Sequence, residues 1–333
     1  MTAPELSCEP MSRSARRPGD FPVVDHFRVV QGVSVGGATE KDILEDPETG
    51  AQYIAKLGKR YNDLEVMTEY AIYLVGRSLG VSVADARIAR FQGRLRFLSK
   101  SFLDRTKPEE LVHGMQLFSE LYDERTVTAV IGDECSEQSM FSVQAIKAAF
   151  GAHYVQYGAD VEEKLFEGLV AMLTHDALIG VQDRHHENWG VIVQRGVSAD
   201  RPRFAPLYDS ARGLFCNETD THLLRYMNGR EGLQRLDGFV ARSRPLVGFD
   251  GLIPAQRRKY ITHDQLLAAV YRSYPKQRTL IQNILTAYDW RRVRDDLTQE
   301  LAPLCSPRRR TLMLTCLRRR LRAIRRAIDG SSS

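Results

Sequence analysis

The sequence predicts an α+β protein in which a small, β-rich lobe is followed by a larger, mostly helical lobe. Two observations predict this class. From about residue 21 to residue 104, short β-prone runs alternate with turns that are charged or contain glycine. From about residue 106 onward, apolar residues recur at helical spacing. We therefore expect a flexible arm at 1–20, a β-rich lobe at 21–104, a helical lobe at 105–304 and a basic helical tail at 305–333.

In the small lobe, four runs are rich in β-branched and aromatic residues and predict strands at 23–30, 53–57, 86–91 and 95–102. One segment between them, 64–79, places apolar side chains three or four residues apart, which predicts a helix that stops at Gly80. In the large lobe the same spacing predicts helices at 139–149, 161–179, 264–271 and 276–301. A pair of strands, 189–194 and 203–207, interrupts the helices.

The tail carries the positive charge of the chain. Residues 308–326 contain nine arginines and no acid, whereas the whole chain has a net charge of +5, so the rest carries −4. Binding of nucleic acid by the body of the protein is therefore not supported. Leucines and isoleucines at helical spacing from 314 to 328 predict a basic amphipathic helix. It either packs on the large lobe with a solvated arginine face or docks on an acidic partner, a nucleic acid or a membrane surface.

Composition also bears on location. No apolar run approaches the roughly 20 residues of a membrane-spanning helix, and residues 1–20 contain no apolar stretch of the kind that a secretory signal needs. The five cysteines lie far apart, without a CxxC pair, which favours neither a disulfide framework nor a zinc site. We expect a cytoplasmic protein with no transmembrane segment, and export as an effector stays open.

The most informative stretch runs from 176 to 193, where a predicted helix enters a polar loop and leaves it as a strand. The loop places Asp183 five residues before Asn188. In phosphotransferases of the protein-kinase type, such an Asp accepts the proton of the attacking hydroxyl and such an Asn holds Mg²⁺. Asp209, at the end of the returning strand, supplies the carboxylate that the metal needs. Together these residues predict a protein-kinase-like two-lobe fold, although the Asp-Arg-His triplet by itself is common.

The small lobe has candidate groups for binding nucleotide. Residues 30–41 form a glycine-rich turn whose backbone amides could approach phosphate, although an ordinary glycine-rich hairpin is the alternative. Lys56 lies inside an apolar strand, and a buried lysine requires an anionic partner. Glu69, on the predicted helix, is our choice of partner, with Glu65 one turn earlier as the competing choice. The other interpretation of Lys56 is a lysine on the exposed face of an edge strand.

With these residues in order, the chain resembles the HipA-like serine/threonine kinase family over about residues 30–213. The resemblance implies an ATP- and Mg²⁺-dependent enzyme whose phosphate loop carries an autophosphorylated serine, here Ser34; an ordinary turn serine is the alternative. The implied catalytic residues are Asp183, Asn188, Asp209 and Lys56, with Asn188 and Asp209 as metal ligands. The implied nucleotide-binding residues are Ser34, Gly36, Gly37, Ala38, Lys41, Lys56, Glu69, Lys100 and Phe102.

The chain also departs from the family pattern. Lys100-Ser101-Phe102 stands where many relatives carry Glu-Arg-Phe, and the chain resembles the compact members that lack an extra amino-terminal subdomain. The implied substrate is a protein with a Ser or Thr acceptor, in a toxin, effector or signalling role. An antitoxin-like or acidic partner would bind at the basic tail. Two other functions stay open: a small-molecule or phosphoinositide kinase on the same fold, and a catalytically silent, pseudokinase-type binding module.

Overall fold

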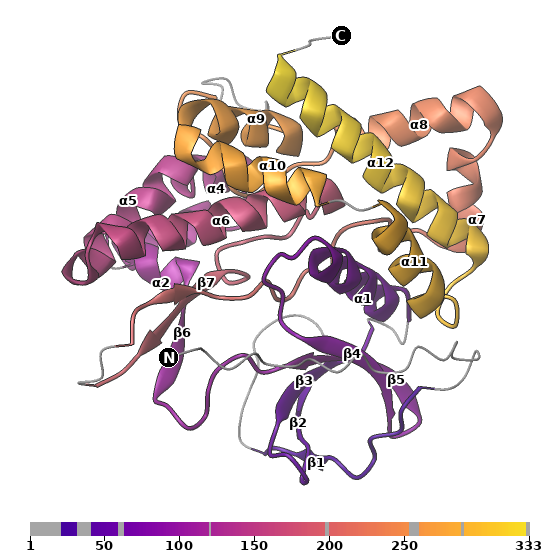
Figure 1. Cartoon of the computed structure of the whole chain (residues 1–333), viewed down its shortest axis with the longest axis horizontal. Coiled ribbons are helices and arrows are strands. Elements are labelled where there is room, and N and C mark those ends of the chain that lie inside the picture. Colours follow the sequence, from indigo (N-terminus) through magenta and orange to yellow (C-terminus); the bar gives the residue numbers. More distant parts are fainter. Residues whose placement is uncertain are drawn as a thin grey trace, which may run out of the picture.

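The computed structural model describes residues 21–31, 41–58, 63–119, 121–196, 200–252, 260–287 and 290–330. Within these residues an antiparallel sheet and one long helix form a small lobe, and a second, short sheet and many helices form a larger one (Figure 1). The predicted two-lobe α+β fold is confirmed.

The small lobe is built on a five-stranded sheet with the order β1-β2-β3-β5-β4, in which all neighbours are antiparallel. Its strands are β1 (Arg28–Val29), β2 (Lys41–Glu45), β3 (Gln52–Lys56), β4 (Ala86–Phe91) and β5 (Arg94–Lys100). Since β3 lies between β2 and β5, Lys56 belongs to an interior strand and not to an edge.

Helix α1 (Asp63–Ser78) lies between this sheet and the helical lobe (Figure 1). Asp63 and Glu65 occupy its first turn and Arg77 its last, so the side-chain charges oppose the helix macrodipole at both ends. Gly80 follows with a φ of 69°, a left-handed conformation that favours glycine and turns the chain away from the helix.

The large lobe contains a three-stranded sheet of order β6-β7-β8. Helix α6 lies at the centre of the lobe and packs against α5, α9, α10 and α12. The strands are β6 (Glu109–His113), β7 (Gly190–Gln194) and β8 (Arg203–Phe204). The helices are α2 (Gly114–Ser119), α3 (Glu124–Val130), α4 (Glu134–Met140), α5 (Val143–Tyr154), α6 (Ala159–Ile179), α7 (Asp220–Leu223), α8 (Gly229–Ala241), α9 (His263–Ser273), α10 (Arg278–Thr286), α11 (Trp290–Glu300) and α12 (Pro307–Asp329).

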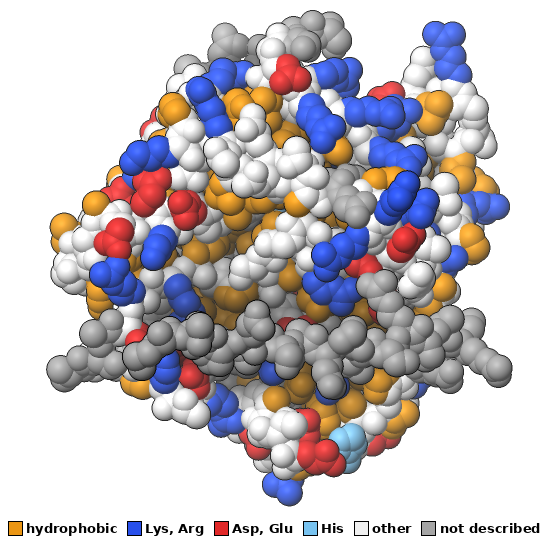
Figure 2. All heavy atoms as spheres, viewed as in Figure 1, with side chains coloured by type: hydrophobic (Ala, Val, Ile, Leu, Met, Phe, Trp, Pro, Cys, Tyr) orange, Lys and Arg blue, Asp and Glu red, His pale blue; other side chains and the backbone are white. Residues whose placement is uncertain are grey.

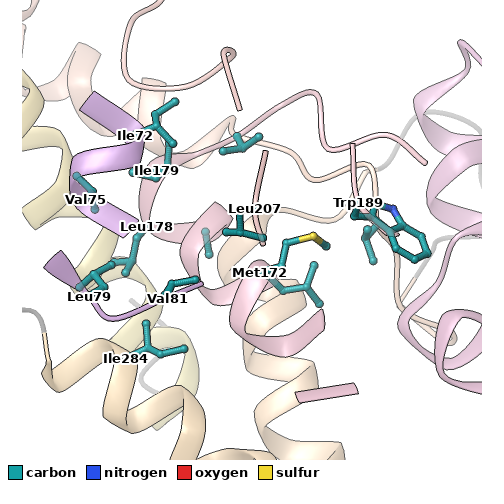
Figure 3. Close-up of a cluster of buried hydrophobic side chains, with 14 of the residues drawn as sticks. Ile72, Val75, Leu79, Val81, Met172, Leu178, Ile179, Trp189, Leu207 and Ile284 are labelled. Carbon is teal, nitrogen blue, oxygen red and sulfur yellow. The ribbon is translucent and has the colours of Figure 1, made fainter. Parts of the chain in front are cut away.

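A continuous hydrophobic core joins the two lobes. Figure 3 shows Ile72, Val75 and Leu79 of α1 beside Leu178 and Ile179 at the end of α6. All five side chains are at most 4% exposed. Burying a side chain of this size stabilises the fold by about 1.5–3 kcal/mol, so this contact fixes α1 to the large lobe.

Several predicted elements differ from the structure. The run at 23–30 contributes only Arg28–Val29 to the sheet, because Val24 and Phe27 instead fold inward on a second small apolar cluster. The predicted helix at 139–149 is divided between α4 and α5, where the Ser142 side chain caps α5 by accepting from the Ala145 amide. The predicted helix at 276–301 is divided between α10 and α11, which pack on different partners, α6 and α1.

Strand β6 lies where we expected only helices. Its residues Glu109–His113 are half-buried and pair in register with β7. Glu109 forms an ion pair with Arg203 of β8, and Glu110 forms one with Arg195, the residue after β7. Pairing with distant residues therefore decides the conformation of this segment. Among the described residues, no helix is long and apolar enough to cross a membrane.

Candidate active site

The loop between α6 and β7 is organised by a buried arginine. Arg184 is 2% exposed and forms a two-pronged ion pair with Asp176 of α6, its Nε and Nη2 donating to the two carboxylate oxygens at 2.8 and 3.0 Å. The remaining donors contact the carbonyls of Asn188 and Tyr208, each at 2.8 Å, and the Ser210 hydroxyl. One guanidinium thus ties helix α6, the loop and the segment around residue 209 together.

Asp183 and Asn188 lie on this loop and are in contact. The Asn188 side-chain amide donates to the Asp183 carbonyl at 2.8 Å, which orients the amide within the loop. One carboxylate oxygen of Asp183, Oδ1, is buried and has no partner among the described residues, and the other lies 3.9 Å from the Arg212 guanidinium. Burial raises the pKa of Asp183 to about 6, against the lowering effect of Arg184. A carboxylate in this state can accept a proton near neutral pH.

Asp209 follows the short strand pairing at 203–204 and has a φ of 48°, an uncommon conformation for a residue with a side chain. Its two carboxylate oxygens contact two lysines: Lys56 Nζ at 2.9 Å and Lys41 Nζ at 3.0 Å. Burial alone would raise the pKa of Asp209, but these two ammonium groups hold it well below its ordinary value. The carboxylate is therefore ionised throughout the physiological range.

Lys56 lies between two carboxylates, because its ammonium also contacts Glu69 of α1. The partner of Lys56 is thus Glu69 and not Glu65. Burial lowers the pKa of Lys56, yet Glu69 and Asp209 more than offset burial and hold the pKa above its ordinary value. The same burial raises the pKa of Glu69 to about 7, since the attraction of Lys56 only partly offsets the loss of water. The small lobe and the segment around residue 209 therefore meet at one lysine.

A small, partly open pocket lies beside these charged groups, and its walls include Lys56, Gly58, Glu65, Glu69 and Asp209. Glu69 and Asp209 also line a second small pocket, together with Tyr73, Ser99 and His175. The charged groups therefore lie at the walls of two small pockets.

Other predicted site residues lie apart from this cluster or outside the described residues. Lys100 is exposed at the end of β5, and the Phe102 ring lies 5.5 Å from the ring of Tyr208, the residue before Asp209. Phe102 is therefore near the site. Among the described residues, Lys100 contacts none of the charged groups of the site. Ser34, Gly36, Gly37 and Ala38 lie outside the described residues.

Sequence reasoning missed the residues that support the site. Arg184 stands between Asp183 and His185 in the loop, but only the fold reveals that it is buried and that Asp176 is its partner. The available signal was the acid Asp176 near the end of an otherwise apolar helix. Tyr208, whose hydroxyl donates to the Glu187 carbonyl at 2.9 Å, and Arg212 were missed for the same reason.

The residues present fit a nucleotide phosphate chain with a divalent cation. Mg²⁺ takes oxygen ligands, which the ionised carboxylate of Asp209 and the amide carbonyl of Asn188 can supply. The two lysine ammoniums at Asp209 suit phosphate oxygens. The unpartnered, buried Asp183 oxygen suits the hydroxyl of an acceptor.

Comparison with known proteins decides the family. A family model for the HipA-like C-terminal domain matches residues 33–269, which is most of the chain. The chain belongs to the HipA-like family. A search of the curated proteins finds no match. Kinase chemistry is the activity that membership of the HipA-like family supports, and such enzymes generally use ATP and Mg²⁺.

Two solved structures are similar to this HipA-like chain. The crystal structure of the Helicobacter pylori proinflammatory kinase CtkA matches with a TM-score of 0.70 at 18% identity, covering 94% of this chain and 100% of that chain. HipA of Shewanella oneidensis MR-1, from a toxin–antitoxin system solved with HipB and its operator DNA, covers 90% of this chain and 68% of that chain at 14% identity and a TM-score of 0.49. The likeness to CtkA shows that this chain has the fold of a kinase.

Proposed function

We propose that this chain is an ATP- and Mg²⁺-dependent kinase that phosphorylates Ser or Thr hydroxyls of proteins. The observation that carries the proposal is the position of Lys56 between Glu69 and Asp209, 2.9 Å from the Asp209 carboxylate. This contact brings a lysine of the small lobe to an ionised carboxylate of the large lobe. Kinases require both groups at the nucleotide phosphates.

Each residue has a proposed role. Lys56, with Lys41, would bind the phosphates, and Asn188 and Asp209 would hold Mg²⁺, which supplies charge neutralisation when bound. Asp183 would orient the acceptor hydroxyl and accept its proton. Under this proposal residues 21–104 form the nucleotide-binding lobe and residues 105–304 the lobe that binds the acceptor. The cysteine spacing favours a cytoplasmic setting for this reaction.

The first test is phosphate transfer from ATP by the purified chain with Mg²⁺. Asp209→Asn removes one charge from the site without removing volume, so we expect transfer to be abolished while circular dichroism is unchanged. Asp200→Asn is the matched control, because Asp200 is exposed and its recorded ion pair is with the exposed Lys107. Normal transfer by the Asp209→Asn enzyme would contradict the assignment.

The choice of acceptor is tested in the same assay. A protein extract and phosphoinositide-containing vesicles are offered in parallel to the active enzyme. Label in protein supports a protein kinase, and label only in lipid supports the lipid-kinase alternative. Absence of ATP turnover in every condition would support a silent binding module.

Ser34 belongs to the same proposal. A phosphate on this serine would add about −1.5 to −2 charges beside the nucleotide phosphates and repel them. We therefore propose that the kinase phosphorylates Ser34 and thereby switches itself off. Mass spectrometry of the wild type beside Asp209→Ala tests this, with phosphate on Ser34 expected only in the wild type. Full activity of Ser34→Asp would refute self-inhibition.

A further inference from the structure

The arginines of helix α12 divide into an inward set and an outward set. The inward set serves the fold. Arg309 is fully buried and donates to Asp220 at 2.8 Å and to the carbonyls of Phe215 and Glu218. Arg320 is 3% exposed and lies against Gly180, where a Cβ atom would come within 2.2 Å of its guanidinium carbon. These two arginines are therefore not available to a partner.

The outward set includes Arg318, Arg322, Arg325 and Arg326 of the carboxyl-terminal half of the helix, which are all exposed. Spacings of three and four residues place them on one face of the helix. The guanidinium carbon of Arg318 lies over the Trp290 ring, 3.5 Å from its centroid, and Arg325 donates to the Leu285 carbonyl at 3.2 Å, so both are held in place. Figure 2 shows the resulting band of basic side chains along the line of α12. We call these four residues the α12 basic face.

The surrounding charge has the same sign. Residues 260–330 contain fifteen Lys and Arg and six Asp and Glu, hence a net charge of +9, which leaves −4 for the rest of the chain. The carboxyl-terminal half of α12 lies at the end of the helical lobe remote from the five-stranded sheet (Figure 1). The α12 basic face therefore lies remote from the five-stranded sheet, within a part of the chain whose net charge is positive.

The chemistry of this face selects among anionic partners. Protein interfaces have apolar or aromatic side chains at their centre. Within the described residues, none of the large hydrophobic side chains of α9 to α12 is exposed. A membrane-binding helix inserts its apolar face into lipid, but Leu312, Leu317 and Ile324 of α12 are buried in the lobe. The α12 basic face itself therefore offers neither an apolar centre for a protein interface nor an apolar side for insertion into a membrane.

Nucleic acid backbone requires only cations within reach of its phosphates. A helix rises about 1.5 Å per residue, so Arg318, Arg322 and the adjacent Arg325 and Arg326 form a row of cations about 12 Å long on α12. Duplex DNA is a straight polyanion with one charge per ~1.7 Å, and planar guanidinium groups pair with phosphate through two hydrogen bonds. Single strands are bound largely by stacking on aromatic rings, and the Trp290 ring beside this face is covered by Arg318. These facts favour a duplex over a single strand.

We propose that the α12 basic face is a docking surface for the phosphate backbone of duplex nucleic acid, bound without sequence preference. The contact uses no residue of the kinase site, so it does not depend on the proposed kinase activity. Its effect is to place the kinase on a nucleic acid surface while the site between the lobes stays open.

The test is fluorescence anisotropy of the full-length chain with a labelled 20-base-pair DNA duplex of mixed sequence, titrated at several salt concentrations. The logarithm of the binding constant falls with the logarithm of salt concentration by about 0.9 per phosphate contact. We expect Arg322→Gln/Arg326→Gln to reduce this slope by about two and to weaken binding at 100 mM salt on the order of ten- to a hundred-fold.

The matched control is Arg28→Gln/Arg94→Gln, which removes the same charge from exposed positions in the small lobe and should leave the slope within error of the wild type. Equal losses in both double variants would overturn the proposal, because the effect would then be one of net charge. Tighter binding of a single strand of the same length would also overturn the proposal. So would binding to phosphatidylserine vesicles, if the α12 substitutions abolish vesicle binding while duplex binding persists. Unchanged phosphate transfer by the α12 variant is expected in every case.

Discussion

At the scale of single residues, the site gives three aspartates three different states. Asp176 is buried and Asp209 is half-buried, and each lies beside cations that hold its pKa below the ordinary range. Asp183 is also half-buried, but one of its carboxylate oxygens lies 3.9 Å from Arg212 and the other has no partner among the described residues. The same side chain can therefore serve as an anchor, a metal ligand or a base, according to which cations surround it.

The pKa of Asp183 predicts the acid limb of the rate profile. Burial raises this pKa to about 6, and a base must be ionised to act. We expect kcat/KM to be retained above pH 6 and to fall about tenfold per pH unit below it. Asp183→Asn should lower kcat by orders of magnitude and leave ATP affinity nearly unchanged, because the base acts on the acceptor. Initial rates from pH 4.5 to 8 and nucleotide titrations measure both.

A control for this assignment is Arg212→Gln. The positive charge of Arg212 lowers the pKa of Asp183, so its removal should move the midpoint of the acid limb to higher pH. An acid limb that stays in the Asp183→Asn enzyme would show that another group titrates. Loss of ATP affinity along with turnover in that enzyme would mean that Asp183 is a metal ligand or a structural residue.

The sequence allowed the prediction of residues whose chemistry depends on spacing along the chain. Asp183 and Asn188 are five residues apart on one loop, and Lys56 lies in a strand thirteen residues before Glu69. Sequence reasoning preferred Glu69 but left Glu65 open, because the partner of Lys56 depends on how α1 is rotated against the sheet. Arg184 could not be recognised as a buried anchor, since its five contacts come from segments between four and twenty-six residues away.

At the scale of elements, prediction succeeded where local pattern and tertiary packing agree. The tail helix, expected within residues 305–333, is observed at Pro307–Asp329, because Ser306 caps its start and Gly330, with a φ of 73°, ends it. Strand β6 and the division between α10 and α11 were missed because each is decided by a distant partner, β7 in one case and α1 in the other.

The junction between α6 and the catalytic loop yields the second prediction. Gly180 ends α6 with a φ of 76°, and the Arg320 guanidinium occupies the space that a Cβ atom at this position would need. In Gly180→Ala the left-handed backbone costs about 1–2 kcal/mol, and displacement of Arg320 adds about 1–3 kcal/mol. We expect a lower free energy of unfolding in urea and reduced kcat, since the loop that holds Asp183 begins at this residue.

Gly80→Ala is the control at this scale. Gly80 follows α1 with a φ of 69°, but a Cβ atom there meets nothing within 4 Å. The Gly80→Ala variant should therefore lose only the stability that the left-handed backbone costs a residue with a side chain. Equal losses of stability in the two variants would refute a role for the Arg320 contact at the start of the catalytic loop.

At the scale of the whole molecule, helices from the end of the chain hold the helix that carries Glu69. The Ser78 hydroxyl of α1 donates to Asp296 of α11 at 2.8 Å, and Tyr70 donates to Glu300 at 3.1 Å. Arg77 adds an ion pair with Asp296 at 3.6 Å. These contacts join residues more than 200 positions apart, which no local pattern reveals. The position of α1, and with it the Lys56–Glu69 pair, thus depends on the carboxyl-terminal helices.

The last prediction concerns Asp296, which is 6% exposed and touches none of the charged groups of the site. Asp296→Ala leaves the Ser78 hydroxyl and Arg77 without this acceptor, which should lower the free energy of unfolding by about 1–3 kcal/mol. If α11 fixes α1, kcat should fall as well, because Glu69 then no longer holds Lys56 in place.

Asp296→Asn keeps an oxygen acceptor and should recover most of both losses. Asp295→Ala, next in the chain and paired only with its neighbour Arg294 among the recorded contacts, should change stability by less than about 0.5 kcal/mol. Urea unfolding and steady-state kinetics separate the outcomes: an Asp296→Ala enzyme that is less stable but has full kcat would show that α11 supports the fold without positioning the site.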